Sequence, residues 1–425
     1  MATAVKQSGK GTDNVPAGVY RYNGRSPHVF ILIYFTLRSF IMTRFAHRID
    51  QALTFHAIEV TKAAQQLREQ GRDIISLGIG EPDFTAPPIV VDTLARAAQA
   101  GLSGYSPALG IMPLRSAIAD YYKSHWGAEV DPERIIITAG ASGALSLACM
   151  ALLNPGDEIL MPDPAYPANS NFILCSGATP RLVPCTAQER FQLSADKIAA
   201  HWTDKTRGVL IASPSNPTGT SIEREELVRI IQTVRERGGV VIMDEIYLGL
   251  CYDRVPRSAL TLDPQIVVIN SFSKYFNMTG WRLGWMVVPE AMVGPVEKLA
   301  ASLNICPPTL AQHAAISCFT EEALAIYEHR RLAFMERRDY LLPEFEKLGI
   351  HVPVKPDGAF YIYADISQHG MNSDQFAHKL LHEAGIAVVP GLDFGPAYAQ
   401  KMIRVSYATA LDRLREAIER LQKIL

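Results

Sequence analysis

The chain has 425 residues, of which 48% are hydrophobic and 20% are charged, a composition typical of a folded globular protein rather than a disordered one. Because this length exceeds what a single core usually supports, we expect two domains. The 41 basic and 43 acidic residues leave a formal charge of −2, which favours neither nucleic acid nor a membrane as a partner. Six scattered cysteines lack metal-ligand spacing, so we predict a cytoplasmic protein without a metal site.

The first 41 residues are expected to be an extension that adds nothing to the fold. Residues 1–27 are polar, and the apolar run Val29–Leu37 is too short to span a bilayer, which takes about 20 residues per helix. A signal peptide is the alternative, although the run has no obvious small-residue cleavage pattern. We therefore predict that residues 1–41 are a disordered extension and that 42–75 form an N-terminal arm belonging to the smaller domain.

From about residue 70 onward, short apolar runs alternate with helix-like segments. The predicted strands are Arg134–Thr138, Glu158–Met161, Gly208–Ala212, Val240–Met243 and Ile266–Ile269. Helical spacing covers Ser142–Leu153 and the amphipathic segment Arg224–Arg237. Continuously apolar strands separated by helices indicate a largely parallel sheet with both faces covered, and such sheets bind ligands at the carboxyl ends of their strands. We predict that this large domain covers 76–305.

After about residue 305 helical segments dominate. Two strands are predicted at Ala359–Tyr363 and Met402–Tyr407. The apolar residues of Leu411–Ile424 recur every three or four positions, which predicts an amphipathic closing helix. We expect 306–425 to form a smaller α+β domain.

Functional side chains follow the ends of four predicted strands. Asp244 follows one strand, Asn216 another, Lys274 a third, and the small-residue turn Gly140–Gly143 a fourth. Each has an ordinary structural explanation, such as a helix N-cap for Asp244, a turn at Asn216 or a solvated position for Lys274. Taken together, however, they put an acid, an amide, an amine and a tight turn at one edge of one sheet.

Pyridoxal 5'-phosphate would use all of these groups. Its phosphate needs backbone N–H groups at a helix N-terminus, as at Gly140–Gly143. A carboxylate such as Asp244 keeps the pyridine nitrogen protonated, and Asn216 and Tyr247 suit the phenolic oxygen. The aldehyde needs an amine whose pKa is lowered by burial and by neighbouring cations, and Lys274 suits that role and could later move a substrate proton.

The motif Ser-Phe-Ser-Lys…Met-Thr-Gly-Trp-Arg-Leu-Gly-Trp at 271–285, with Asn-Pro-Thr-Gly and Asp-Glu-Ile-Tyr upstream, resembles the class I and II aminotransferases of the aspartate aminotransferase superfamily. The resemblance runs from about Leu77 to about residue 408. It implies the pyridoxal-phosphate-dependent fold type I, with a mostly parallel seven-stranded sheet in the large domain and a smaller α+β domain. It also implies a ping-pong transfer of an amino group between an L-amino acid and a 2-oxo acid, through a Schiff base on Lys274.

The resemblance assigns a role to individual residues. The implied cofactor-binding residues are Tyr105, Ala141, Ser142, Tyr166, Asn216, Asp244, Tyr247, Ser271, Ser273, Lys274 and Arg282. Gly80, Asn216 and Arg404 would bind the substrate, with the Arg404 guanidinium on its α-carboxylate. Tyr105 matches a tyrosine that reaches the phosphate of a neighbouring subunit, which implies a homodimer. Arg282, between two tryptophans, is expected to be a buried charge that needs an anion.

Two other functions stay open. A lyase acting on a C–S or Cβ bond would share every cofactor residue, but it would release pyruvate and ammonia without an amino acceptor. A regulator that senses the cofactor would normally carry a DNA-binding module, and the N-terminal extension has no helix-turn-helix pattern. The substrate side chain also stays open, because no second arginine can be assigned to a distal carboxylate. Phe55, Ile58 and Tyr363, expected near the entrance, would permit aliphatic or aromatic substrates.

Overall fold

The computed structural model of the chain describes residues 45–54 and 56–425, so the predicted extension 1–41 and Phe55 lie outside the described residues. Residues Asp50–Leu425 form one unit, to which the following description applies. Its helices, together with the short α2 at its start, are α2 (Arg48–Gln51), α3 (His56–Glu69), α4 (Pro88–Gln99), α5 (Met112–Tyr121), α6 (Gly140–Leu152), α7 (Pro167–Cys175), α8 (Ala195–His201), α9 (Arg224–Glu236), α10 (Glu290–Leu303), α11 (Thr309–Ala315), α12 (Glu321–Lys347), α13 (Ser373–Lys379) and α14 (Leu411–Leu421). None of the helices in the described part of the chain is both long and apolar enough to cross a membrane.

Twelve strands form three sheets in the described residues. The strands are β1 (Ile75–Ser76), β2 (Ile135–Thr138), β3 (Glu158–Asp163), β4 (Thr179–Pro184), β5 (Thr206–Ala212), β6 (Val240–Asp244), β7 (Val267–Ser271), β8 (Gly284–Val287), β9 (Tyr361–Asp365), β10 (Ile386–Ala387), β11 (Val389–Pro390) and β12 (Met402–Ser406). The largest sheet has seven strands in the order β2-β8-β7-β6-β5-β3-β4. Only β8 runs antiparallel to its neighbours, so the predicted mostly parallel seven-stranded sheet is confirmed.

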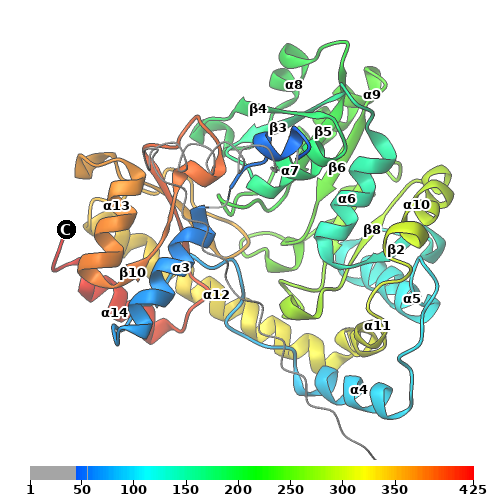
Figure 1. Cartoon of the computed structure of the whole chain (residues 1–425), viewed down its shortest axis with the longest axis horizontal. Helices are drawn as coiled ribbons and strands as arrows, with labels where there is room; N and C mark the ends of the chain where they lie inside the picture. Colours follow the sequence, from blue (N-terminus) through cyan, green and yellow to red (C-terminus); the bar gives the residue numbers. More distant parts are fainter. Residues whose placement is uncertain (1–44, 55) are drawn as a thin grey trace, which may run out of the picture. The chain divides into compact units, whose positions relative to one another are not determined.

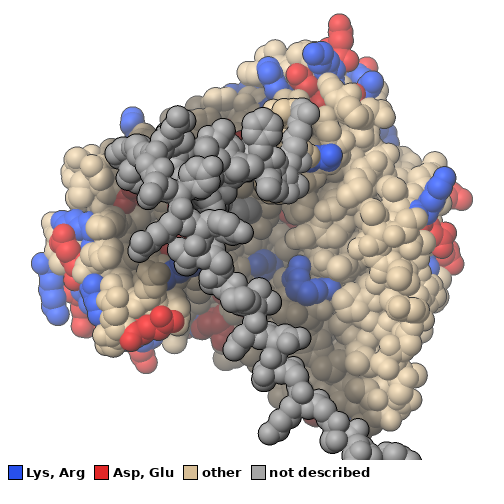
Figure 2. All heavy atoms as spheres, in the orientation of Figure 1, with Lys and Arg blue, Asp and Glu red and all other residues tan. Residues whose placement is uncertain are grey.

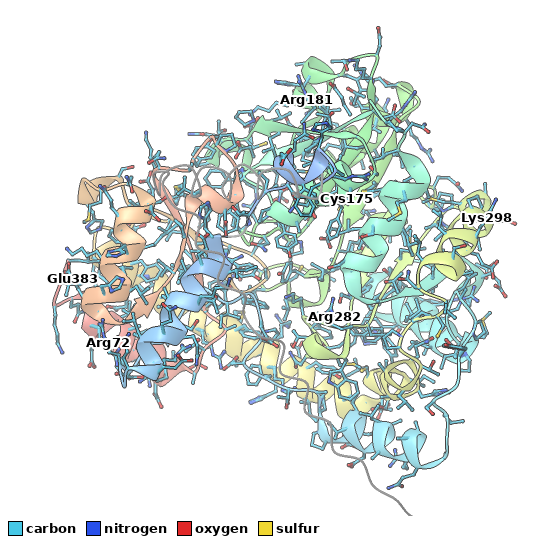
Figure 3. All side chains as sticks on the ribbon, viewed as in Figure 1. Arg72, Cys175, Arg181, Arg282, Lys298 and Glu383 are labelled. Carbon is cyan, nitrogen blue, oxygen red and sulfur yellow. The ribbon has the colours of Figure 1, made fainter. Side chains whose placement is uncertain are left out.

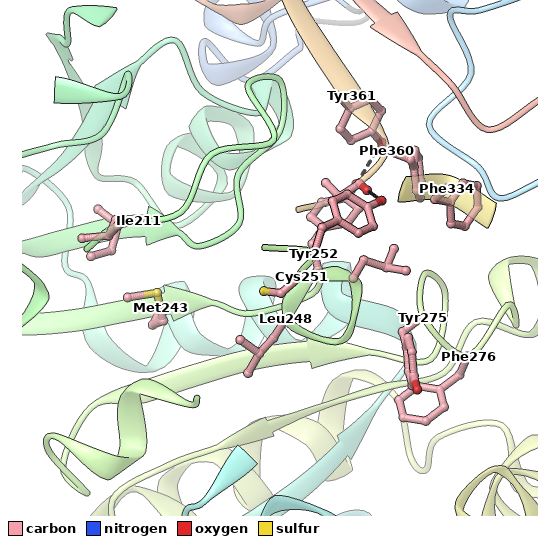
Figure 4. Packing of buried hydrophobic residues seen from close by; sticks show 14 of the residues in the cluster. Ile211, Met243, Leu248, Cys251, Tyr252, Tyr275, Phe276, Phe334, Phe360 and Tyr361 are labelled. Atoms are coloured by element: carbon pink, nitrogen blue, oxygen red, sulfur yellow. Dashed lines mark hydrogen bonds between the residues drawn. The ribbon is translucent and has the colours of Figure 1, made fainter. Parts of the chain in front are cut away.

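Alternate residues of the strands supply the cores on the two faces of this sheet. On β6, Val241 and Met243 belong to one buried cluster, and Ile242 between them belongs to the other. Helices cover both faces, which is why these strands are continuously apolar. Figure 4 shows part of the first cluster, in which Ile211 and Met243 from the large sheet share a core with Phe334 and Phe360. The segment between β6 and β7 differs from the expected helical crossover, because its only regular elements are two short 3₁₀ turns.

Two smaller sheets come mainly from the last hundred residues. The order β11-β12-β9 is antiparallel throughout, and β1 pairs with β10 in parallel. Helix α3 packs Ala64 in a buried cluster with Leu381 and Ala387, although more than 300 positions separate them. Figure 1 shows the same neighbourhood, with α3 beside α13 and α14. The closing helix α14 buries Leu414, Ile418 and Leu421 as its spacing predicts.

The strand directions explain how distant side chains meet. Since β8 is antiparallel to both β2 and β7, β2 has the same direction as β7, β6 and β5. The carboxyl ends of these four strands therefore lie at one edge of the sheet, where open α/β sheets bind their ligands. Over the face drawn in Figure 2, acidic and basic side chains are interspersed, with no large area of a single sign.

Candidate active site

A cavity of about 560 Å³ lies at this edge of the sheet. The predicted site residues that line it are Gly80, Ala141, Ser142, Tyr166, Asn216, Asp244, Tyr247, Ser271, Ser273, Lys274, Arg282 and Arg404. Tyr105 does not line it and is 83% exposed. Among the described residues no cluster of three His, Cys, Asp or Glu side chains could hold a metal ion. The structure thus brings together every predicted site residue of this chain except the one expected to act in a neighbouring subunit.

Lys274 is half-buried just beyond β7, and its Nζ donates a hydrogen bond to the carbonyl oxygen of Gly80 at 2.5 Å. Burial and the nearby positive charges of Arg404 and Arg282 lower its pKa to about 8, while Glu81 and Asp244 act in the opposite direction. A lysine with this pKa has a substantial neutral fraction near neutral pH, and only the neutral amine is nucleophilic. The site therefore contains an amine suited to attack an aldehyde.

Asp244 ends strand β6 and is buried. Burial raises its pKa to about 6, against the hydrogen bond that its Oδ1 accepts from the Ile246 N–H at 3.0 Å and the charge of Lys274. A buried carboxylate without an ion pair is unfavourable unless a cationic partner binds it. None of the described residues forms a salt bridge with Asp244, so the carboxylate is available to a protonated ring nitrogen.

The N-terminus of α6 and the turn before β8 form the anion-binding side of the cavity. Helix α6 begins at Gly140, where φ is +74° and a Cβ would overlap the Arg282 guanidinium. Only glycine therefore lets Arg282 lie across this helix start, whose free N–H groups attract anions. Figure 3 labels Arg282 on the turn between β7 and β8. The prediction that Arg282 is buried was wrong: it is exposed at the edge of the cavity, with φ +54° and Nη1 donating to the Thr279 carbonyl at 2.8 Å.

Ser271 and Ser273 are buried beside Lys274 and hydrogen-bonded to each other. The Ser271 hydroxyl donates to Ser273 Oγ at 2.9 Å and to the Leu283 carbonyl at 3.1 Å, and the Ser273 N–H donates to Ser271 Oγ at 3.0 Å. These bonds tie the end of β7 to the turn that carries Arg282. Two hydroxyls and a guanidinium thus converge near the start of α6, a set of donors suited to a phosphate.

Arg404 lies at the centre of β12 and is only 5% exposed. Its Nη1 donates to Asn216 Oδ1 at 2.9 Å and its Nη2 to the Gly78 carbonyl at 2.7 Å, whereas its buried Nε has no hydrogen-bond partner in the described residues. The guanidinium lies 4.6 Å from the Tyr361 ring centroid and 5.0 Å from that of Phe394. It forms no ion pair with any described carboxylate. A buried guanidinium held in this way is suited to bind a ligand carboxylate.

Tyr361 was missed by the sequence prediction although it lines the cavity. Its hydroxyl is 2.9 Å from that of Tyr247, so the two phenols are hydrogen-bonded. A Cβ on Gly80 would lie 2.7 Å from the same hydroxyl, which gives the expected crowding at Gly80 a specific partner. The available signal was the alternation along β9, which pairs with β12 and places Tyr361 two positions from the neighbour of Arg404.

The expected entrance residues differ in position. Ile58 lines the cavity, whereas Tyr363 is buried in a separate cluster with Phe191 and Met402. Other lining residues were not predicted, and they come from α3, from the loop after β1 and from the loop after β11: Ala57, Thr61, Ile79, Glu81, Asp393 and Phe394. No strand-end pattern marks these positions, because they lie on a helix and loops outside the large sheet.

Comparison with known proteins gives a consistent result. The family described as aminotransferase class I and II matches residues 72–421. The valine–pyruvate aminotransferase of Mycobacterium tuberculosis is 39% identical over 369 residues, covering 86% of this chain and 95% of that protein. The aspartate aminotransferase of Pyrococcus abyssi is 36% identical, covering 83% of this chain and 92% of the relative.

Solved structures agree with the sequence relatives. An aminotransferase from Mycobacterium tuberculosis superimposes with a TM-score of 0.86 at 38% identity, covering 90% of this chain and 99% of the other. The aspartate aminotransferase of Thermus thermophilus with maleate gives 0.85 at 33% identity, covering 90% of this chain and all of the other. The fold is that of the fold type I aminotransferases, as the motifs implied. The chain belongs to the class I and II aminotransferase family.

Proposed function

We propose that this aminotransferase binds pyridoxal 5'-phosphate, the cofactor of its family, through Lys274 and uses it to move an amino group between an L-amino acid and a 2-oxo acid. The observation that carries the proposal is the unpaired Arg404 guanidinium in the same cavity as a lysine whose pKa is about 8. One group fits a substrate carboxylate, and the other fits an aldehyde. The lining residues meet the cofactor's needs, with Asp244 for the pyridine nitrogen and the α6 start, Ser271, Ser273 and Arg282 for the phosphate.

The residues of the chain then have distinct tasks. The bound cofactor supplies an electron sink that makes the substrate Cα–H acidic. Arg404 holds the substrate α-carboxylate and is itself oriented by Asn216 and Gly78. The Lys274 amine, once free of the cofactor, takes the proton from Cα as a general base and returns it as a general acid. Asp244 keeps its negative charge beside the ring nitrogen, while Tyr166 and Tyr247 line the remaining cavity wall.

The proposal includes a homodimer with shared sites. Tyr105 supports it, since this large aromatic side chain is 83% exposed and lies outside the cavity of its own chain. We also propose domain boundaries near 75/76 and 305/306 and a cytoplasmic location, which rest on the sequence. Light scattering of the purified chain tests the dimer, and Tyr105→Ala should weaken cofactor affinity. A monomer with full activity would contradict the shared site.

The test of the activity uses the full chain with added pyridoxal 5'-phosphate. An amino acid alone should yield its 2-oxo acid stoichiometrically and no free ammonia, and initial rates with both substrates should give parallel double-reciprocal lines. Lys274→Ala should abolish the visible absorbance of the lysine-bound cofactor and multiple turnover. Lys298→Ala, an exposed lysine on α10 labelled in Figure 3, is the matched control and should change neither. Ammonia and pyruvate released without an acceptor would identify the lyase instead.

A further inference from the structure

The charged groups of the cavity leave no cation of this chain for a second substrate carboxylate. Six acidic or basic side chains line it: Glu81, Asp244, Lys274, Arg282, Asp393 and Arg404. Under the proposed function each of the three cations already has a partner, namely the aldehyde for Lys274, the phosphate for Arg282 and the α-carboxylate for Arg404. The described residues thus offer no fourth positive charge to the distal carboxylate of a dicarboxylic substrate.

Two of the acidic groups have no role in binding the cofactor, and both oppose a distal carboxylate. The buried Asp393 accepts hydrogen bonds from the His56 N–H at 2.6 Å and the Ala57 N–H at 2.8 Å, so its carboxylate is fixed at the start of α3. It lies close enough to Arg404 for the two charges to interact. Glu81 accepts a hydrogen bond from the Thr279 hydroxyl, and its charge acts on Lys274. A second carboxylate would be desolvated among like charges.

The uncharged part of the wall is apolar and open to the cavity. Ile58 on α3 is 52% exposed and Ile79 is 39% exposed, which is unusual for large aliphatic side chains that line a binding site. Phe394 adds an aromatic face beside Arg404. A ligand side chain that covers these groups gains from burial of apolar surface on both partners.

We propose that the site takes monocarboxylic substrates with apolar side chains in both half-reactions. This inference rests on the proposed function, in which donor and acceptor occupy the same cavity in turn and therefore meet the same charges. Its consequence is that 2-oxoglutarate is a poor acceptor as well as aspartate and glutamate poor donors. Amino acids such as alanine and valine, with pyruvate as acceptor, are the substrate class that the cavity fits.

The test compares kcat/KM values of the full chain with its cofactor. Alanine and valine should exceed aspartate and glutamate at least tenfold with pyruvate as acceptor, and pyruvate should exceed 2-oxoglutarate at least tenfold with alanine as donor. A dicarboxylate that equals or exceeds the apolar substrates, for example because a second copy of the chain supplies a cation, overturns the inference and leaves the aminotransferase activity intact. If no donor of either class yields a 2-oxo acid, the proposed function itself fails.

Variants locate the cause of the preference. Glu81→Gln keeps the size of the side chain and its acceptor for Thr279 but removes the negative charge, so the aspartate-to-alanine ratio of kcat/KM should rise about fivefold or more. Ile79→Arg, which adds a cation to the apolar wall, should raise the same ratio at least tenfold. Val255→Arg is the matched control, since Val255 is 71% exposed and does not line the cavity; it should leave the ratio unchanged. An unchanged ratio in Glu81→Gln overturns the electrostatic explanation, whether or not Ile79→Arg folds.

Discussion

Replacing Gly80 by alanine adds one methyl group at a position where the structure has no room for it. The new Cβ would lie 2.7 Å from the Tyr361 hydroxyl, about 0.7 Å inside the 3.4 Å at which ordinary contact begins. Tyr361 cannot simply swing away, because it is buried, hydrogen-bonded to Tyr247 and stacked against Arg404. Overpacking costs about 1–3 kcal/mol, and a lost hydrogen bond about 1 kcal/mol.

We therefore expect Gly80→Ala to lower the free energy of unfolding by about 2 kcal/mol. A displaced Tyr361 also moves the ring that supports Arg404, so kcat/KM should fall about tenfold, mainly through a higher KM for the amino acid. The assays are urea unfolding of the cofactor-free chain and steady-state kinetics of the loaded enzyme. Gly104→Ala is the control, since a Cβ there meets nothing within 4 Å, and it should change neither quantity.

The double variant Gly80→Ala/Tyr361→Phe isolates the cause. Without the hydroxyl, the next atom of residue 361 near the new methyl is Cζ at 3.7 Å, an ordinary contact distance. The second substitution should therefore recover part of the stability lost in the first, with a coupling free energy of about 1 kcal/mol or more. Strictly additive effects of the two substitutions would refute the steric reasoning.

Four further predictions concern the site and the core. Arg404→Lys should reduce kcat/KM for every amino donor about 100-fold, because an ammonium cannot bind a carboxylate bidentately, while the absorbance of bound cofactor stays. Because its lowered pKa is about 8, the Lys274 amine becomes neutral as the pH rises from 7 to 9, so stopped-flow loading of cofactor-free protein should accelerate across this range. Asp244→Asn should abolish most turnover yet raise the unfolding free energy of the cofactor-free chain by about 2 kcal/mol at pH 8 and not at pH 5, since a carboxylate whose pKa is raised to about 6 destabilises the fold only when ionised. Ile242→Ala in the fully buried centre of β6 should cost about 3 kcal/mol in urea unfolding.

The parts of the fold that the sequence predicted are those where burial is complete. β5 and β6 have covered faces and therefore read as uninterrupted apolar runs. β4 was missed because it is an edge strand, partly exposed and interrupted by Pro180 and Pro184. β8 was missed because it has only four residues and follows directly from the turn that carries Arg282.

The site divides in the same way. Lys274, Asp244 and Asn216 were predictable because topology fixes where a residue after a parallel strand must lie. Asp393 and Glu81 lie on loops outside the large sheet, and nothing in their local sequence indicates which cavity they approach. The burial of Arg282 was wrongly predicted from its tryptophan neighbours, because side-chain exposure depends on tertiary contacts that sequence neighbours do not determine.

Strand β8 also determines the order in which the site can be assembled. β2 pairs with β8 and with no other described strand, and the two are separated by about 150 residues of chain. Gly284 on β8 lets this strand pass close to Gly140, where a Cβ would lie 2.7 Å from its carbonyl carbon. During synthesis, which proceeds from the N-terminus, the start of α6 waits for Arg282 until β8 has left the ribosome. Affinity for the phosphate of the cofactor thus arises late and in a single step, so nascent chains ending before residue 284 have no complete anion site.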